Sequence, residues 1–259
     1  MILDRARRIL LTLGLPVVLV TIWWFATLDS TNFFVPPLKE IVQVFPSTWL
    51  EGQLKEDVLP SVLRLAAGYS AAVLVGITVG TAIGLRRKLR DYLEPVLEFI
   101  RAIPPTVLIP IIMLFAGIEN GMKILVIAFG CVWPVLLNTV EGVRSVDEVL
   151  RDTGRTYRLG RVTSLTKLTL RGASPQIMTG ARQALSIGII LMVISEMFAA
   201  TNGLGFTTIQ FQRTFAIPEM YTGIILLGIL GVLLAQLFKL AERHILSWYF
   251  GIRHMQRKG

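Results

Sequence analysis

Long runs without a charged residue constrain this chain more than any other feature. Five such runs cover Ile9–Leu28, Leu65–Leu85, Ala102–Ile118, Ile124–Val140 and Met220–Phe238, and a shorter sixth, Gln183–Ser195, continues past Glu196. A helix needs about 20 apolar residues to cross the hydrocarbon of a bilayer. A soluble helical core is the alternative, but helices of that kind carry a polar face, which these runs lack. The sequence therefore predicts an all-α membrane protein of about six transmembrane helices.

The first run raises the question of a signal peptide, because Arg5, Arg7 and Arg8 precede it. The run is longer than the apolar segment of a signal peptide, and no small-x-small cleavage site follows it. We interpret it as a retained first span.

The placement of basic residues predicts the orientation. With six spans and a cytoplasmic N-terminus, 18 of the 26 lysines and arginines fall in cytoplasmic segments, and only Lys39, Lys55, Lys123 and Arg213 fall outside. The positive-inside rule then places both termini in the cytoplasm of a bacterial inner membrane. The net charge of +9 reflects this topology and contact with lipid headgroups. A nucleic-acid partner is not expected, because zinc-finger spacing and a basic helix with stacking aromatics are both missing.

We divide the chain into three parts. Residues 1–56 hold a cytoplasmic tail, the first span and a short external surface helix that begins after Val35-Pro36-Pro37. Residues 57–245 form the transmembrane domain, with a cytoplasmic loop over residues 144–174. Residues 246–259 form a basic cytoplasmic tail.

Small residues and prolines mark the inner spans. The second span repeats a small residue every four positions, which predicts a groove for close approach of another helix: Gly68, Ala72, Gly76, Gly80 and Gly84. Prolines predict helix kinks in the third span and the fourth: Pro104, Pro105, Pro110 and Pro134.

The loop over residues 144–174 has structure of its own. Ser145 and Glu148 match a capping box, so a helix is expected to start there and to end at Leu159-Gly160. A second helix is expected to run to about Arg171, before Pro175 opens the fifth span. A structured loop of this length favours a docking knob over an ordinary solvated loop.

From Pro60 to about Arg243 the chain resembles permeases of ABC importers of the nitrate, sulfonate, taurine and bicarbonate group. The segments that carry the resemblance are Pro60-Ser61-Val62-Leu63-Arg64 with Gly68, Gly80 to Arg86, Glu94-Pro95, Arg101-Ala102-Ile103-Pro104-Pro105, Leu114-Phe115-Ala116-Gly117-Ile118, Gly142-Val143 with Val146-Asp147, and Ser195-Glu196-Met197-Phe198-Ala199-Ala200 followed by Gly203-Leu204-Gly205.

The resemblance implies a type I importer fold and three kinds of partner. These are a dimer of ATPase subunits that holds ATP and Mg, a second permease copy (the same chain or a different one), and a periplasmic or lipoprotein substrate-binding protein. This chain itself would hold no cofactor.

The family docks its ATPase through a motif that reads Glu-Ala-Ala, three residues, then Gly. At those positions this chain has Asp152-Thr153-Gly154 and Arg158, with Gly160 two residues later. The candidate coupling residues are Asp152, Thr153, Gly154, Arg155, Thr156, Tyr157, Arg158, Leu159 and Gly160. A departure from the motif is compatible with a heterodimer in which the other permease carries it, or with an altered ATPase cleft.

Glu196 is an ionisable residue inside a span and therefore a functional candidate. It either hydrogen-bonds the amides of the turn that follows or contacts the solute, and we favour the first. The candidate gate or turn comprises Glu196, Asn202, Gly203, Leu204 and Gly205.

The sequence argues against an enzyme and a metal site. It has no GxxxxGK[ST] phosphate loop and no Ser/His/Asp or paired-carboxylate constellation. Cys131 stands alone, and His244 and His254 lack further ligands nearby. From the resemblance, the expected function is ATP-driven uptake of a small solute by alternating access, the solute being a small organic or inorganic anion of the sulfonate, nitrate, bicarbonate or aromatic acid type. The alternatives are a secondary transporter or channel and a membrane scaffold.

Overall fold

The computed structural model describes the backbone of residues 2–51 and 53–256, and side chains from residue 14 to residue 251 except 52 and 199. All elements in these ranges are helices. The first half comprises α1 Ile2–Thr27, α2 Leu38–Trp49, a π-helical turn Leu54–Val58 leading into α3 Leu59–Leu85, α4 Arg87–Arg101, a 3-10 turn Pro105–Leu108, and α5 Ile109–Ala116. The second half comprises α6 Asn120–Arg144, α7 Glu148–Thr156, α8 Arg161–Thr163, a π-helical turn Ser164–Thr169 leading into α9 Leu170–Ala199, α10 Leu204–Arg213, α11 Ile217–Ile245 and α12 Ser247–Gln256.

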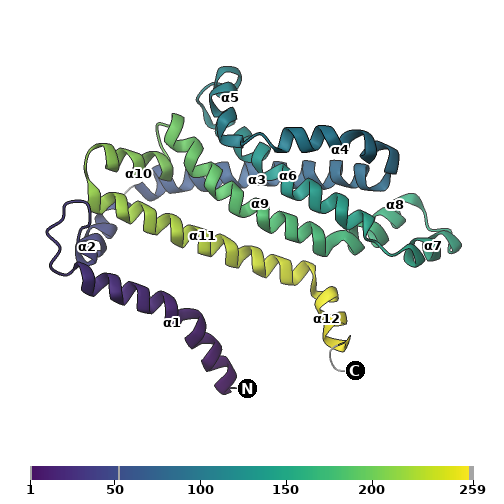
Figure 1. Cartoon of the computed structure of the whole chain (residues 1–259), viewed down its shortest axis with the longest axis horizontal. Coiled ribbons are helices and arrows are strands. Elements are labelled where there is room, and N and C mark those ends of the chain that lie inside the picture. The colour runs from purple at the N-terminus through teal and green to yellow at the C-terminus, as the bar shows by residue number, and fades with distance from the viewer. Residues whose placement is uncertain (1, 52, 257–259) are drawn as a thin grey trace.

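Three long helices form the centre of the molecule. α6 packs along α3 on one side and along α9 on the other, and α11 lies against α9 (Figure 1). α2 and α10 lie at one end of the long axis, and α7 and α8 lie at the other (Figure 1). The two ends are called the α10 end and the α7 end below.

Four helical stretches are long and apolar enough to cross a membrane: Leu54–Leu85, Asn120–Arg144, Arg161–Phe198 and Ile217–Ile245. They confirm the second, fourth, fifth and sixth predicted spans. The third span is a bent pair, because Arg87–Arg101 and Pro105–Ala116 meet at an angle of 76°. The described apolar part of α1, Gly14–Thr27, is shorter than a span. The side chains that complete the predicted first span lie outside the described residues, so that span stays a prediction.

The prolines stand at helix starts more often than inside bent helices. Pro104 precedes the 3-10 turn and Pro105 opens it, at the bend between α4 and α5. Pro110 lies in the first turn of α5, where its missing N–H leaves no helical hydrogen bond unmade and no kink is needed. Pro134 lies within α6, which is continuous from Asn120 to Arg144.

The row of small residues on α3 brings two helix backbones together. A Cβ on Gly68 would lie 2.8 Å from the carbonyl oxygen of Ile124, and one on Gly76 would lie 2.8 Å from the Cβ of Val135. Gly80 and Gly84 face Leu136 and Val143 in the same way. The predicted groove therefore holds α6 along almost the whole of α3.

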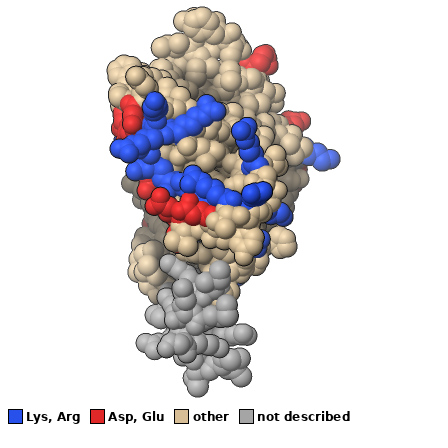
Figure 2. Space-filling model, turned by 90° about the vertical axis from the view of Figure 1, so that its right-hand side faces the viewer, with Lys and Arg blue, Asp and Glu red and all other residues tan. Residues whose placement is uncertain are grey.

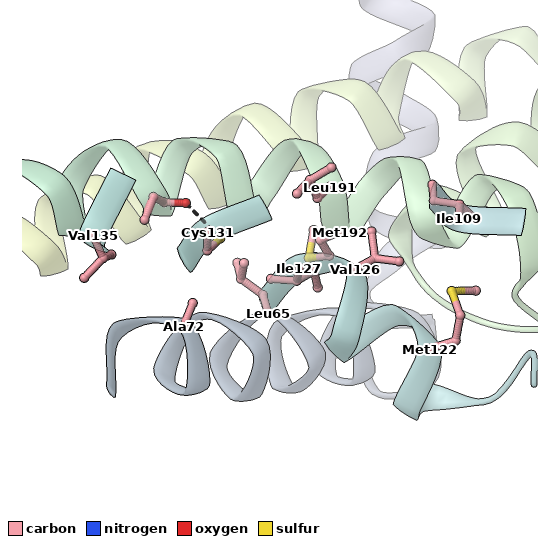
Figure 3. Close-up of a cluster of buried hydrophobic side chains, with 11 residues drawn as sticks. Leu65, Ala72, Ile109, Met122, Val126, Ile127, Cys131, Val135, Leu191 and Met192 are labelled. Atoms are coloured by element: carbon pink, nitrogen blue, oxygen red, sulfur yellow. Dashed lines mark hydrogen bonds between the residues drawn. The ribbon is translucent and has the colours of Figure 1, made fainter. Parts of the chain in front are cut away.

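The apolar core lies where these helices meet. Leu65 and Ala72 of α3, Ile109 of α5, Leu191 of α9 and side chains of α6 form one buried cluster (Figure 3). The Cys131 thiol donates a hydrogen bond to the carbonyl oxygen of Ala184 at 3.1 Å, within this cluster. The single cysteine is thus a packing residue between α6 and α9.

The loop between α6 and α9 differs from the prediction at three points. α7 is capped by Asp147, whose Oδ1 accepts from the N–H of Val149 at 2.8 Å, so the Ser145/Glu148 capping box is wrong. α7 ends at Thr156, before Leu159-Gly160. Helix then continues from Arg161 through Pro175 to Ala199, so Pro175 does not open a new helix. Gly172 is a packing residue, because a Cβ there would lie 3.1 Å from Val146.

α2 confirms the short helix predicted after the first span. Ile41 and Trp49 are fully buried, and the Trp49 indole N–H donates to the Thr222 hydroxyl of α11 at 2.8 Å. Its apolar face therefore packs on protein, while Val42 stays exposed on the other side.

Replacing Gly80 by valine tests the close packing of α3 on α6. The new Cβ would lie 2.8 Å from the carbonyl oxygen of Leu136, which a backbone cannot relieve cheaply. Overpacking of this kind costs about 1–3 kcal/mol. We expect a lower melting temperature of the purified protein in detergent. Gly228→Val on α11, where nothing lies within 4 Å, is the matched control. Equal melting temperatures for both variants would contradict the packing argument.

Candidate functional site

A buried polar cluster lies at the α10 end of the molecule. It joins Asp57, Ser61 and Arg64 with Glu196 and with residues 202–205, which form the end of the loop after α9 and the start of α10. It is called the Arg64 cluster below. The Arg64 guanidinium and the Glu196 carboxylate form an ion pair at 2.8 Å. Both side chains are buried, and that of Glu196 is fully so. A buried charge is stable in a fold only when it is paired and hydrogen-bonded, and here both conditions are met.

Arg64 ties together four separate segments. From α3, its Nε donates to Asn120 Oδ1 at the start of α6 at 2.7 Å. Its NH1 donates to the carbonyl oxygen of Asn202 at 3.0 Å, and its NH2 donates to the side-chain oxygen of the same residue. With Glu196 of α9 as its fourth contact, it fixes the ends of three helices and the loop before α10.

The loop before α10 closes over Glu196. The N–H of Gly205 donates to Glu196 Oε2 at 3.0 Å, which is the hydrogen bond that the sequence favoured for this carboxylate. The N–H of Gly203 donates to Asp57 at 2.8 Å, and the N–H of Leu204 donates to Ser61 at 2.9 Å. Gly203 has φ 127°, and a Cβ there would lie 2.5 Å from the Glu196 carboxyl carbon. Only glycine fits this position.

A cavity of about 270 Å³ opens beside the Arg64 cluster. Arg64, Asn120, Lys123 and Asn202 are among its lining residues. The buried Lys123 ammonium donates to the carbonyl oxygen of Ile118 at 2.8 Å. The cluster thus borders a polar space at the α10 end.

The second candidate site is the knob at the α7 end, residues 147–163. It contains all nine predicted coupling residues. Asp147 caps α7, and Glu148 in the first turn and Arg155 in the last turn suit the helix dipole. Asp152 and Arg155 form an exposed ion pair at 3.0 Å, and the Thr156 hydroxyl donates to the carbonyl oxygen of Asp152. Val149, Tyr157 and Val162 present apolar surface outward.

Two residues of the knob explain its departure from the family motif. Gly154 is buried, and a Cβ there would lie 2.6 Å from Leu168 Cδ1. Arg158 stands where the family has glycine, and it adopts φ 49°, in the left-handed region that glycine favours. The N–H of Leu159 then donates to the carbonyl oxygen of Gly154 at 3.0 Å and closes the turn. The turn that glycine would favour is therefore present, built with an arginine.

The sequence identified Glu196 and its turn but missed Asp57, Ser61, Arg64 and Asn120. Arg64 entered the sequence analysis only as part of the family resemblance, although an arginine inside a span is a signal that a partner exists. Leu204, by contrast, contributes its backbone N–H and a fully buried side chain. Among the described residues, no group of three His, Cys, Asp or Glu side chains could hold a metal.

Removing one member of the Arg64–Glu196 pair is expected to destabilise the protein strongly. Arg64→Met leaves the Glu196 carboxylate buried without its cation, a change that costs about 3–5 kcal/mol. Arg101→Met, which breaks an exposed pair with Glu98, is the control and should cost less than about 1 kcal/mol. Melting temperatures in detergent separate the two. A double variant, Arg64→Met/Glu196→Met, should recover part of the loss, and a fully additive loss would contradict the pairing.

We expect the left-handed backbone conformation of Arg158, and not its guanidinium, to stabilise the turn at the end of α7. Arg158→Gly relieves the left-handed conformation, whereas Arg158→Val adds a β-branched side chain that resists it. Hydrogen exchange of the Leu159 amide should stay protected in the first variant and accelerate roughly tenfold in the second. Equal loss of protection in both variants would assign the role to the guanidinium instead.

Comparison with known proteins now identifies the fold. Residues 72–248 match the family described as the binding-protein-dependent transport system inner membrane component. A solved structure of the inward-facing MetNI methionine ABC transporter superposes with a TM-score of 0.66 at 19% identity, covering 77% of this chain and 98% of that one. An amino acid ABC transporter gives a TM-score of 0.53 at 16% identity, covering 83% and 99%.

Curated relatives are more similar in sequence. The taurine transport system permease protein of Escherichia coli is 32% identical, over 94% of this chain and 91% of its own. The aliphatic sulfonates permease protein of Bacillus subtilis, named as putative, is 29% identical over 90% and 86%. The bicarbonate transport system permease protein of Synechococcus elongatus is 31% identical over 73% and 69%.

These matches confirm the predicted resemblance and set aside a secondary carrier, a channel or a scaffold. The chain is not itself an ATPase. It belongs to the family of binding-protein-dependent transport system inner membrane components, as a membrane-embedded permease subunit of an ABC importer.

Proposed function

We propose that this permease imports a small anionic solute, of the sulfonate or carboxylate type, by alternating access. The relatives are named for taurine, aliphatic sulfonates and bicarbonate, each of which carries a compact anionic group. A binding protein, either periplasmic or a lipoprotein, delivers the solute. ATP and Mg reside on the partner ATPase, and this chain contributes no cofactor.

The α7 end faces the cytoplasm in this proposal, together with both termini. Lysines and arginines gather on that face, as Figure 2 shows when the molecule is viewed along its long axis from the α7 end. Basic residues concentrate on the cytoplasmic side of membrane proteins. The α10 end, with α2 and the Arg64 cluster, then faces the binding protein.

The knob is the proposed docking site of the ATPase. It projects from the end of the bundle, and the side chain of Tyr157 is 77% exposed. Aromatic residues of this kind dominate the binding energy of many interfaces. Val149 and Val162 extend the apolar surface beside it. Since helix runs unbroken from Arg161 to Ala199, movement of the knob is passed directly to a membrane span.

The Arg64 cluster is the proposed gate residue set on the other side. Glu196, Asn202, Gly203, Leu204 and Gly205 hold the loop before α10 against α3. Opening toward the binding protein would break the contacts of Asn202 with Arg64 and of Gly205 with Glu196, together with those of Gly203 and Leu204 with Asp57 and Ser61. Lipid contacts the apolar outer face of α11, and a second permease copy, identical or different, completes the pathway.

Purification of the tagged chain with the products of its neighbouring genes tests these partners. We expect an ATPase to copurify in mild detergent. A second, different permease in the complex would identify a heterodimer, and two copies of this chain would identify a homodimer. Solute transport into liposomes by the chain alone, without any ATPase, would contradict the proposal.

Tyr157→Ala is expected to weaken coupling to the ATPase. Loss of a central aromatic anchor should reduce solute-stimulated ATP hydrolysis in proteoliposomes by roughly tenfold. Tyr92→Ala on α4 is the matched control, because that side chain is 81% exposed and lies outside the knob. Replacing residues 152–160 by a Gly/Ser linker should abolish the stimulated hydrolysis altogether. Equal rates of stimulated ATP hydrolysis for Tyr157→Ala and Tyr92→Ala would contradict the proposal that Tyr157 and the knob bind the ATPase.

A further inference from the structure

α9 exposes a row of polar side chains inside a membrane span. Thr179, Arg182, Gln183 and Ser186 are all exposed, and their spacing of three or four residues places them on one helix face. The helix that carries them, Arg161–Phe198, is apolar enough to cross the membrane. These polar side chains are therefore exposed within a segment that crosses the membrane, where lipid would be an unfavourable neighbour for them.

The row reaches the middle of the span. Ser186 lies twelve residues before Phe198, which is roughly 18 Å along a helix that rises 1.5 Å per residue. Nearby, the Tyr69 hydroxyl of α3 donates to the carbonyl oxygen of Ala181 at 3.0 Å, and Gly188 packs against Cys131 at the centre of α6. These neighbours are central residues of their own spans.

Further polar groups join the row from α6. The Asn138 amide donates to Gln183 Oε1 at 3.3 Å, and the Gln176 amide donates to Asn138 Oδ1 at 3.3 Å. Gly180 lets Asn138 approach, since a Cβ there would lie 2.7 Å from that of Asn138. A ladder of three amides thus follows the seam between α6 and α9.

The outer face of α11 is the opposite in character. Between Ile224 and Leu237 its exposed large side chains are apolar apart from Gln236: Ile224, Ile229, Val232, Leu233 and Leu237. Lipid suits such a face. Amide and guanidinium groups in a span instead face protein or a water-filled cavity.

Arg182 gives the row a charge. Its side chain is 57% exposed, whereas that of its partner, Glu242 of α11, is 12% exposed. The guanidinium has five N–H donors in a planar fork that suits two-oxygen binding of anions. The guanidinium is therefore paired with Glu242 through one nitrogen, while more than half of its side chain stays exposed on the helix face that carries Gln183 and Ser186.

We propose that Thr179, Gln183 and Ser186 line the aqueous route of the solute through the membrane, and that Arg182 binds its anionic group on that route. The assignment of the solute class rests on the proposed function, whereas the assignment of the route rests on the exposed polar row alone. The rival occupant is a second permease copy that covers the row with polar side chains of its own.

Cysteine labelling in native membranes tests the route. Gln183→Cys and Ser186→Cys are treated with a membrane-impermeant methanethiosulfonate in the assembled complex, and Val232→Cys on α11 is the matched apolar control at 62% exposure. The unsubstituted chain is the blank, because Cys131 is fully buried. We expect both α9 variants to react at least about 100-fold faster than Val232→Cys, since thiols in hydrocarbon stay protonated and dry.

Reagent charge tests Arg182. A sulfonate-bearing methanethiosulfonate should modify Gln183→Cys roughly tenfold faster than a trimethylammonium one, after correction for their rates with a free thiol. Adding Arg182→Gln should remove the preference. Arg182→Gln/Glu242→Gln, which leaves no unpaired carboxylate, should do the same if the single change prevents folding. In transport, the KM should rise about tenfold, with kcat less affected.

The outcomes are separable. Unreactive thiols at 183 and 186 that instead cross-link between two copies would overturn the route and identify a seam between permeases. Rapid labelling without any charge preference would overturn the role of Arg182. Failure of an ATPase to copurify would contradict the proposed function but leave the labelling pattern unchanged, because labelling needs no ATP.

Discussion

Close contact between helix backbones along the small-residue face of α3 underlies the rest of the structure. Lipid gives apolar helices little reason to associate, so packing and interhelical hydrogen bonds have to hold a membrane bundle together. Gly68, Gly76, Gly80 and Gly84 let α6 lie on α3 at backbone contact distance. Gly142, Gly180 and Gly188 do the same between α6 and α9. The three-helix core is therefore closely packed, and the polar features are attached to it.

The polar features are few and each is tied to the core. Arg64 and Glu196 sit on α3 and α9, which the core holds in fixed register, and the loop before α10 is then determined by their hydrogen bonds. A buried ion pair contributes little to stability compared with apolar packing, but it disfavours arrangements that leave either charge unpaired. The Arg64–Glu196 ion pair therefore favours a single closed conformation of the loop before α10.

Hydropathy and the four-residue spacing of small residues were sufficient to predict four of the spans and a close helix contact on α3, because both are local patterns. The spacing did not identify α6 as the helix that fills the groove. The side-chain pairs that join distant segments could not be predicted in this way. Arg64 and Glu196 lie 132 residues apart, and nothing local in either segment identifies the other as its partner. Pro175 was misread as a helix start because its position within a helix depends on the preceding π-helical turn and on Gly172 packing against Val146. Asp147 and Ser145 both suit a cap, and only the path of α6 decides between them.

One continuous helix connects the three proposed sites. The run from Arg161 to Ala199 begins in the knob, carries the exposed polar row at mid-span and ends three residues after Glu196. Glycine contacts hold the central part of this helix against α6, so we expect a displacement at one end to be carried along it. In the proposed cycle, a displacement of the knob by the ATPase therefore acts on the Glu196 hydrogen bonds directly. Because the Arg64 guanidinium and the Gly205 N–H both bind the Glu196 carboxylate, a shift of Glu196 disturbs both contacts at once.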